Sequence, residues 1–426
     1  MTGLRKKLPP FSRGETILGL IILYFAVLFL RISGFKTPDY PANQTIKLTG
    51  RLSEEPYLKG SNQILTLGRI KVVTEPYPQF FYQDKIEVIG KLKEGLIKDK
   101  GNKFSLYTGK IYRLEDGDKL SLWSRIRRSL TIFRQDLESI FSRLLPEPQA
   151  SLVSGILLGS RTNLPDNFLQ DLRETGTIHL LAASGYNITV VAGSLISFLV
   201  WFFPRKKALP IAFLGIIIYT LMAGAGPAVV RAAIMGSLTY LAQFLGKQKD
   251  AVGGLLLSGV IMTLYNPLII FDIGFQLSFG ATAGIIFFLP LLEKCLIFQP
   301  RTIGHEAALT LAAQFGVLPI LLYHFKTIFF FSPGLNVLLA PLVPPIMAFG
   351  MIVAFGAGFF LPIGKILVWP VWVLSTLMIK LITWFGRLSW GNLKLGEFRF
   401  WWGLVYYLFS VFLVLKIQKK TNVREK

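Results

Sequence analysis

The amino-acid sequence predicts a polytopic α-helical membrane protein with about ten spans and a small, OB-like β-barrel insert outside the membrane. Hydrophobic residues make up 52% of the 426 residues, whereas charged residues make up only 16%. Many apolar runs approach about 20 residues, which is the length a helix needs to cross a bilayer. One stretch near the N-terminus alternates apolar and polar residues instead, as half-buried β-strands do.

Residues 1–35 are interpreted as a cytoplasmic tail and a signal anchor. The basic residues Arg5–Lys7 precede an apolar run, Ile17–Leu30, which Arg31 closes. Positive residues stay on the cytoplasmic side, so the N-terminus is predicted to lie inside the cell. The run is short for a span, and a cleaved secretory signal is the alternative.

Residues 36–118 are predicted to form the extracytoplasmic β domain. The segments IKLTGRL, QILTLGRIKVV, DKIEVIGKLK and KFSLYTGKIYRL show period-two alternation between Gly, Pro and Asn clusters. Four or five short strands favour a small barrel, with the OB-fold as the leading choice. OB-folds bind single-stranded nucleic acid through basic grooves and aromatic faces. Five aromatic residues could supply such faces: Tyr77, Phe80, Phe81, Tyr82 and Tyr107.

A structural role for these aromatic residues is favoured over nucleic-acid binding. Between Lys36 and Lys119 the chain carries 15 basic residues but also 11 acidic ones, so the segment is not strongly basic. The aromatic residues are therefore expected to fill the barrel or to touch lipid headgroups.

Residues 119–177 are predicted to form amphipathic, interfacial helices. In LWSRIRRSLTIFRQDLESIFSRLLP, apolar residues repeat at steps of three and four with arginines between them. The helix should end before Pro146 and lie on the membrane surface or against the transmembrane bundle. Contact of its arginines with DNA is the less favoured interpretation.

Residues 178–420 form the polytopic domain, and residues 421–426 form a cytoplasmic tail. Basic loops at 204–207, 246–250 and 293–294 fall on alternate connections, as does the C-terminal basic segment. This pattern predicts a protein of the cytoplasmic membrane with both termini inside and the β domain outside. Prolines near 341–345 predict a broken or re-entrant helix. The predicted spans are 178–203, 208–224, 227–245, 251–265, 268–292, 305–324, 334–360, 365–386 and 400–417.

The charge balance suits a polyanion but does not require one. The net charge is +22, and from residue 177 onward 19 basic residues face only 6 acidic ones. A path for nucleic acid favours this imbalance, and so does an anionic inner leaflet of the membrane. One cysteine, Cys295, excludes a disulfide framework or a CxxC site. The histidines are widely spaced, so no metal or other cofactor is expected.

One apolar segment, HLLAASGYNITVVAGSL, carries three polar residues inside a predicted span, His179, Ser184 and Asn187. An unsatisfied polar group in hydrocarbon is costly, so these residues are expected to line a pore or a polar seam between helices. Gly185 would allow a helix break. The Ser-Gly pair is also compatible with an intramembrane hydrolase, but that would need a histidine from another span, His305 or His324.

A second segment, GAGPAVVRAAIMG, places a charge inside a span. Gly224, Gly226 and Pro227 permit a helix break or close packing, and Arg231 follows one turn later. A charged residue inside a membrane normally faces a partner or water. Arg231 is therefore a candidate for the substrate path.

A third segment, FDIGFQLSFGATAG, supplies the expected counter-charge. Asp272 and Gln276 are four residues apart and share a helix face, and Gly280 permits close packing. Asp272 is the acid best placed to neutralise Arg231. The pair could be purely structural, or both residues could line a path in which Arg231 meets phosphates.

These three segments, in this order and about 40 residues apart, resemble the signatures of the ComEC-type competence family. The resemblance covers about residues 45–420. It implies an N-terminal anchor, an external OB-like domain and a channel that passes one strand of transforming DNA across the cytoplasmic membrane. The first segment departs from the family pattern at SGYN, where Tyr186 and Asn187 replace the usual Leu-His.

The resemblance also implies partners. Single-stranded DNA and the anionic membrane would bind directly, while a separate DNA receptor and a cytoplasmic motor or helicase would supply selection and energy. The chain ends at Lys426 without an HxHxDH motif, so a nuclease is expected to be a separate partner and this chain is not expected to be an enzyme. Two alternatives are a transporter of another anionic polymer or small solute, and the intramembrane hydrolase.

Overall fold

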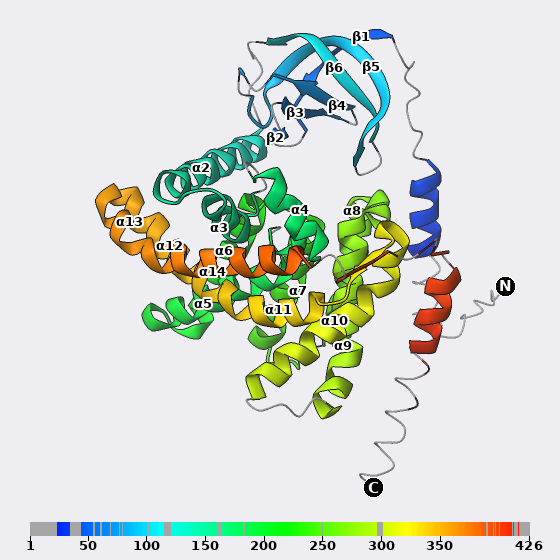
Figure 1. Ribbon diagram of the computed structural model, residues 1–426, viewed down its shortest axis with the longest axis vertical. Helices are drawn as coiled ribbons and strands as arrows, with labels where there is room; N and C mark the ends of the chain where they lie inside the picture. The colour runs from blue at the N-terminus through cyan, green and yellow to red at the C-terminus, as the bar shows by residue number, and fades with distance from the viewer. Residues whose placement is uncertain are drawn as a thin grey trace, which may run out of the picture.

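The computed structural model describes residues 24–34, 44–53, 56–59, 62–68, 70–75, 77–78, 80–99, 102–114, 121–160, 164–181, 184–248, 250–295, 301–388, 391–394, 396, 398–399, 401–410, 412 and 416. These residues form a β-sheet at one end and a helical bundle below it, with a long helix between them (Figure 1). The predicted N-terminal tail and the tail at 421–426 lie outside the described residues.

The sheet has six strands in the order β1-β5-β6-β4-β3-β2. All neighbouring strands are antiparallel except β4 and β6, which are parallel. Alternating side chains build its core, as period-two sequences require. The strands are β1 (Thr45–Arg51), β2 (Tyr57–Lys59), β3 (Asn62–Leu67), β4 (Ile70–Thr74), β5 (Lys85–Asp99) and β6 (Asn102–Arg113).

The prediction of a small β region is confirmed. Among the described strands, β1 and β2 lie at opposite edges of the sheet, so its closure into an OB-like barrel stays a prediction. Phe80 and Tyr82 are buried, with exposed fractions of 4% and 5%, whereas Tyr77 is 74% exposed. The structural interpretation therefore holds for Phe80 and Tyr82. The side chain of Tyr107 lies outside the described residues.

Helix α2 (Leu122–Leu144) connects the sheet to the bundle (Figure 1). Ser121 caps it by accepting a hydrogen bond from the N–H of Ser124, and the helix ends before Pro146 as predicted. Arg134 pairs with Glu138 at 3.1 Å and donates to the carbonyl of Met222 at 3.3 Å. The amphipathic helix is thus confirmed, and it is tied to the bundle by its polar side as well as by its apolar side.

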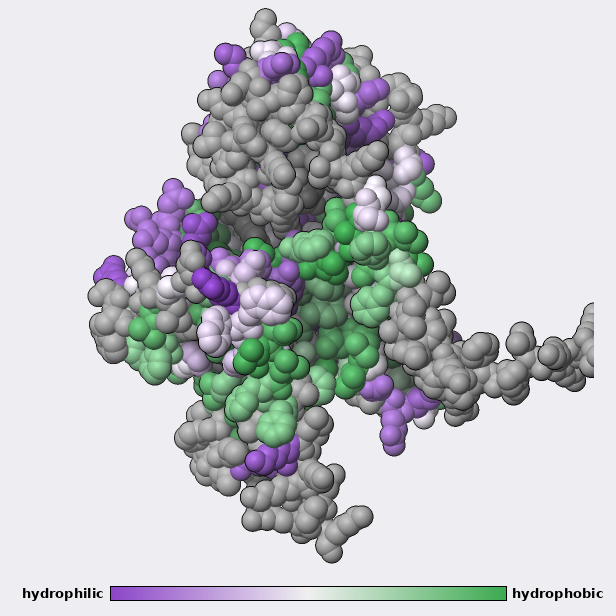
Figure 2. Space-filling model, turned by 90° about the vertical axis from the view of Figure 1, so that its right-hand side faces the viewer, coloured by the Kyte–Doolittle hydropathy of each residue, from purple (hydrophilic) through white to green (hydrophobic). Residues whose placement is uncertain are grey.

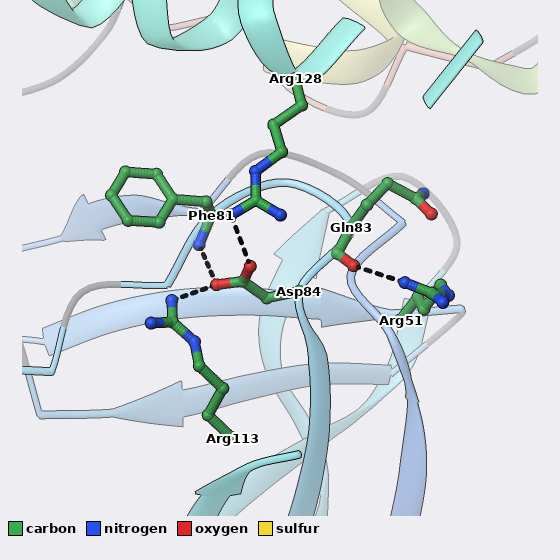
Figure 3. A network of polar contacts seen from close by, with 6 residues as sticks. All are labelled: Arg51, Phe81, Gln83, Asp84, Arg113 and Arg128. Carbon is green, nitrogen blue, oxygen red and sulfur yellow. Dashed lines mark hydrogen bonds and ion pairs between the residues drawn. The ribbon is translucent and has the colours of Figure 1, made fainter. Parts of the chain in front are cut away.

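A charged network joins α2 to the sheet (Figure 3). The carboxylate of Asp84, which is buried, accepts a hydrogen bond from the N–H of Phe81 at 2.8 Å and also binds Arg113 of β6. Arg128 of α2 reaches the other oxygen of the same carboxylate at 3.4 Å. Beside it, Arg127 donates to the hydroxyl of Tyr82 at 3.0 Å and lies 4.3 Å from the centre of its ring.

The core of the bundle surrounds α3 (Gln149–Leu158), whose residues from 150 to 158 are all buried. An apolar helix without a polar face needs neighbours on every side. Phe141 of α2, Leu335 and Val371 belong to the same core cluster. Two shorter elements follow α3 in the chain, α4 (Asp166–Glu174) and η1 (Ile178–Leu180).

Each of the nine predicted spans contains a helix. The predicted break near Pro341 is confirmed, because a 3₁₀ segment separates two α-helices there. The elements are α5 (Gly185–Phe202), α6 (Arg205–Met222), α7 (Pro227–Phe244), α8 (Ala251–Tyr265), η2 (Pro267–Phe271), α9 (Ile273–Cys295), α10 (Arg301–Phe325), α11 (Ser332–Leu339), η3 (Ala340–Leu342), α12 (Val343–Phe359), α13 (Leu361–Leu367), α14 (Trp369–Gly386) and a helix over 401–410. A helix over Tyr24–Ser33 precedes the sheet, and β7 (Thr327–Phe329) pairs with β8 (Asn392–Lys394).

The protein is a multi-pass membrane protein. Within the described residues, five helical segments are long and apolar enough to cross a bilayer, and Figure 2 shows a broad apolar surface over the helical part of the chain. The full number of about ten spans, their orientation and the domain boundaries stay predictions. The five segments are Ile178–Phe202, Ile273–Lys294, Gly304–Phe325, Ser332–Gly358 and Trp369–Gly386.

Helices α9 and α10 pack backbone against backbone. A Cβ atom placed on Gly316 would overlap the carbonyl oxygen of Gly280 and the Cα of Gly284. Gly280 and Gly284 are four residues apart, the spacing that lets membrane helices approach closely.

We therefore expect Gly316→Ala to destabilise the protein by about 1–3 kcal/mol, because the two backbones must move apart. The melting temperature in detergent, followed by fluorescence-detected size exclusion, measures this. Gly236→Ala in α7 is the matched control, since a Cβ there meets nothing within 4 Å and alanine favours the helix. Equal melting temperatures for the two variants would contradict the prediction.

Candidate functional site

The site is built around Arg231 on the second turn of α7. The turn before α7 has positive φ at Gly224 (81°) and Ala225 (48°), a conformation that glycine adopts without strain. Gly226 then caps the helix, and Pro227 takes its first position, where a missing N–H costs nothing. The sequence GAGP thus starts α7 at a point that places Arg231 inside the bundle.

The guanidinium of Arg231 touches all three predicted signature segments. The Arg231 side chain is only 9% exposed, and its Nη1 donates to the carbonyl of Ser278 and to the hydroxyl of Thr282, both on α9. Its Nη2 lies against Gly185, where a Cβ would be only 2.6 Å away. Any other residue at position 185 would therefore require the guanidinium to shift from its place beside the start of α5.

Arg231 has no carboxylate partner in the described part of the chain and lies beside the start of a helix. Among the described residues, no ion pair involves Arg231, and its Nε has no hydrogen-bond partner. Helix α5 begins at Gly185, so its positive end lies beside the guanidinium. A buried cation is costly when it has no counter-charge. The arrangement is therefore suited to hold an anion.

Asp272, the predicted partner of Arg231, binds the backbone at the start of α9 instead. Its Oδ1 accepts a hydrogen bond from the N–H of Phe275 at 3.0 Å, so it caps the start of α9. Arg231 meets α9 at Ser278, six residues further on, which is about 9 Å along a helix. The predicted ion pair is corrected accordingly: Asp272 stabilises the N-terminus of α9 and lies too far along the helix to pair with Arg231.

Gln276 links α9 to other elements. Its Nε2 donates to the carbonyl of Ile270 at 2.9 Å, and its Oε1 accepts from Nε2 of His324 on α10 at 2.8 Å. Gln276 and Asp272 therefore share the start of α9, as the sequence predicts, without joining the Arg231 cluster. Gly280, on the next turn, faces Gly316 of α10.

Ser184 and Asn187 bind each other and the end of α3. The Ser184 hydroxyl accepts from the N–H of Asn187 at 3.3 Å and donates to its Oδ1 at 2.9 Å. Asn187, which is 3% exposed, donates to the carbonyl of Ile156 at 2.8 Å. Tyr219 of α6 donates to the next carbonyl, that of Leu157, at 3.0 Å. These contacts satisfy carbonyls that the end of a helix leaves unpaired, and they form a polar seam between α3, α5 and α6.

The histidines do not meet Ser184 in the described part of the chain. A nucleophilic serine needs a base within hydrogen-bond reach, but the Ser184 hydroxyl bonds to Asn187. Nor do three or more His, Cys, Asp or Glu side chains of the described residues gather as a metal site. The histidine partners are Gly176 carbonyl for His179 (3.0 Å), Glu293 for His305 (2.6 Å) and Gln276 for His324 (2.8 Å).

Sequence reasoning missed three contributors to the site. Ser278 and Thr282 are four residues apart and so share one face of α9. Arg231 binds the backbone carbonyl of Ser278, for which the side chain gives no signal, whereas the hydroxyl of Thr282 inside an apolar span was the available signal. Tyr219 carried no comparable signal, because tyrosine is common in membrane helices.

Comparison with known proteins identifies the family. The family model described as "Competence protein" matches residues 156–420, more than half of the chain. The chain belongs to the competence protein family. The match starts at Ile156, the residue whose carbonyl Asn187 binds. The predicted resemblance is thereby confirmed.

Two relatives show how much of the family this chain represents. It is 33% identical to "ComE operon protein 3" of Bacillus subtilis (strain 168) over 211 residues, which are 49% of this chain and 26% of that protein. It is 25% identical to "Uncharacterized protein YcaI" of Escherichia coli (strain K12) over 276 residues, which are 61% of this chain and 36% of that protein. The matched regions thus span well under half the length of these relatives.

We expect Asn187→Ala to destabilise the protein by about 1–3 kcal/mol, because the Ile156 carbonyl would be left buried and unpaired. The melting temperature in detergent measures the loss. Thr189→Ala is the control, since Thr189 is exposed on the same helix and bonds only to Gly185 within it. A melting temperature of Asn187→Ala equal to that of the control would show that the polar seam does not stabilise the fold.

Proposed function

We propose that this protein is a conduit for single-stranded transforming DNA across the cytoplasmic membrane during DNA uptake, and that it catalyses no reaction. The observation that supports this proposal most directly is the meeting of the three signature segments at Arg231. Gly185, Arg231 and Ser278 come from parts of the chain about 50 residues apart, yet Arg231 contacts both of the others inside an apolar bundle.

A phosphate backbone fits the chemistry of this cluster. The guanidinium of Arg231 is buried, its Nε is without a partner among the described residues, and a helix N-terminus adds positive potential. Arginine and helix N-termini are common phosphate ligands in proteins. A cation without a carboxylate partner among the described residues can hold successive phosphates briefly, as transport requires, whereas a tight ion pair with a carboxylate would compete with them.

The proposal also includes topology and partners. The β domain would lie outside the cell and both termini inside, with the excess of basic residues facing the anionic inner leaflet. A separate receptor would deliver DNA, a separate nuclease would remove one strand, and a cytoplasmic motor or helicase would supply energy. The chain contains no GxxxxGK[ST] motif that would bind a nucleotide.

Deletion of the gene tests the function. We expect cells without this protein to keep labelled DNA on their surface and to lose the nuclease-resistant label inside. Unchanged internal label would contradict the proposal and would favour a transporter of another anionic polymer or of a small solute. Loss of uptake in Ser184→Ala, with normal protein level, would favour the hydrolase instead.

Substitution of Arg231 tests the path. We expect Arg231→Gln to lower the internalised label about tenfold or more with surface label unchanged, a loss of roughly 1.4 kcal/mol of interaction or more. Arg231→Lys should lose less, because it keeps the charge but not the planar fork.

Two variants control for folding and for general charge. Thr282→Val removes a hydrogen bond of Arg231 without changing charge, and Lys365→Gln removes an exposed cation of α13. Thr282→Val should lower import less than Arg231→Gln, and Lys365→Gln should import DNA normally. If Thr282→Val fails as severely as Arg231→Gln, Arg231 has a structural role, and the path lies elsewhere.

A further inference from the structure

The junction between the sheet and α2 is the second place where arginines gather. Arg113 and Arg128 converge there on the carboxylate of Asp84 (Figure 3). Arg127 lies over the ring of Tyr82 and donates to its hydroxyl. Two arginines therefore share this carboxylate. The side chains of Arg113 and Arg128 are 49% and 36% exposed, so solvent and ligands can reach them.

Helix α2 carries these arginines where they disfavour the helix. Arg125, Arg127 and Arg128 lie in its first two turns, and its first turn contains no acidic residue. Cations near a helix N-terminus oppose the helix dipole, which favours anions there. The structure thus places both the side-chain charge and the helix end so that they attract an anion from outside the protein.

We infer that this junction binds the phosphodiester backbone of single-stranded nucleic acid, with Arg127 and Arg128 as its phosphate ligands. This inference rests on the proposed function. It implies that the strand enters the protein at α2. The Asp84–Arg128 contact, at 3.4 Å and partly exposed, is weak enough for a phosphate to replace. Asp84 holds the guanidinium in position until the strand arrives.

Aromatic residues of the segment that leads to Asp84 fit the bases of such a strand. Tyr77 is 74% exposed, and Phe81 lies 6.0 Å from the guanidinium of Arg113. Both belong to the segment that leads to Asp84. Single-stranded nucleic acid binds where a basic groove runs beside aromatic faces, because every base can stack regardless of sequence.

The orientation of α2 favours nucleic acid over lipid headgroups. Ile126 and Phe133 are exposed, seven residues apart and on one face of the helix, where they can rest on the membrane surface. At about 100° per residue, Arg128 points roughly 160° away from Ile126. Its contact with Asp84 confirms that it faces the sheet rather than the bilayer.

The test measures binding of the full-length protein in nanodiscs to a fluorescent oligothymidylate across a series of salt concentrations. We expect R127Q/R128Q to weaken binding at least tenfold at low salt. The slope of log affinity against log salt should fall in magnitude by about 1.4, because each phosphate that is no longer neutralised changes the slope by about 0.7. The matched control, R143Q/K365Q, removes the same charge from exposed positions outside the first two turns of α2 and should change affinity less than threefold.

Further variants separate binding from structure. Tyr82→Phe removes the hydroxyl that accepts from Arg127 but keeps all charges, so its salt slope should match that of the unmodified protein. A slope lowered as far in Tyr82→Phe as in R127Q/R128Q would overturn the inference and assign these arginines to domain docking. Identical behaviour of the two double variants would overturn it as well.

Two further comparisons identify the ligand and show whether the inference or the proposed function has failed. If R127Q/R128Q binds the oligonucleotide normally but loses binding to vesicles of anionic lipid, the site is for headgroups and the inference fails. If R127Q/R128Q binds the oligonucleotide normally while gene deletion abolishes internal label, the inference fails and the proposed conduit stands. If deletion leaves the internal label unchanged, the conduit itself is wrong, whatever the binding shows.

Discussion

A polar group inside the apolar bundle is costly unless it finds a partner in the protein, because hydrocarbon offers none. The end of α3 shows how this constraint organises the fold. Its last carbonyls would be unpaired, and Asn187 of α5 and Tyr219 of α6 donate to two of them. The same hydrogen bonds fix α5 and α6 relative to the central helix, so satisfying the backbone also determines the packing.

The same constraint explains the contacts of the last described helix. Pro319 has no N–H, so the carbonyl of Phe315 in α10 loses its partner within the helix. The hydroxyl of Tyr406 donates to that carbonyl at 3.1 Å, and Tyr407 donates to the neighbouring carbonyl of Gly316 at 2.9 Å. The carbonyl that proline leaves unpaired in α10 thereby helps to hold the helix over 401–410 against α10.

Arginine is used differently at two levels of the molecule. Inside the bundle, Arg231 binds neutral oxygens of α9 and has no ion pair among the described residues. At the sheet, Arg128 shares the carboxylate of Asp84 with another arginine. Both places combine positive charge with a helix N-terminus. This recurrence is what a route for a polyanion would require.

The sequence by itself determined the type and order of the elements. Apolar runs located the bundle helices, alternation located the sheet, and the periodicity of α2 gave its end at Pro146, because these patterns reflect local burial and backbone chemistry. The three signature segments also identified the family. The partners of individual polar residues depend on which helices meet, and local patterns do not contain that information.

Only the tertiary structure decided those partners. Asp272 was the obvious counter-charge for Arg231, yet it caps α9, while two hydroxyl-bearing residues of that helix bind the guanidinium. The sequence predicts that Ser184 and Asn187 line a pore or a seam, and their contacts place them in the seam. The physical reason is that helix register and crossing, which follow from the packing of glycines such as Gly185 and Gly316, set the distance between side chains far apart in the chain.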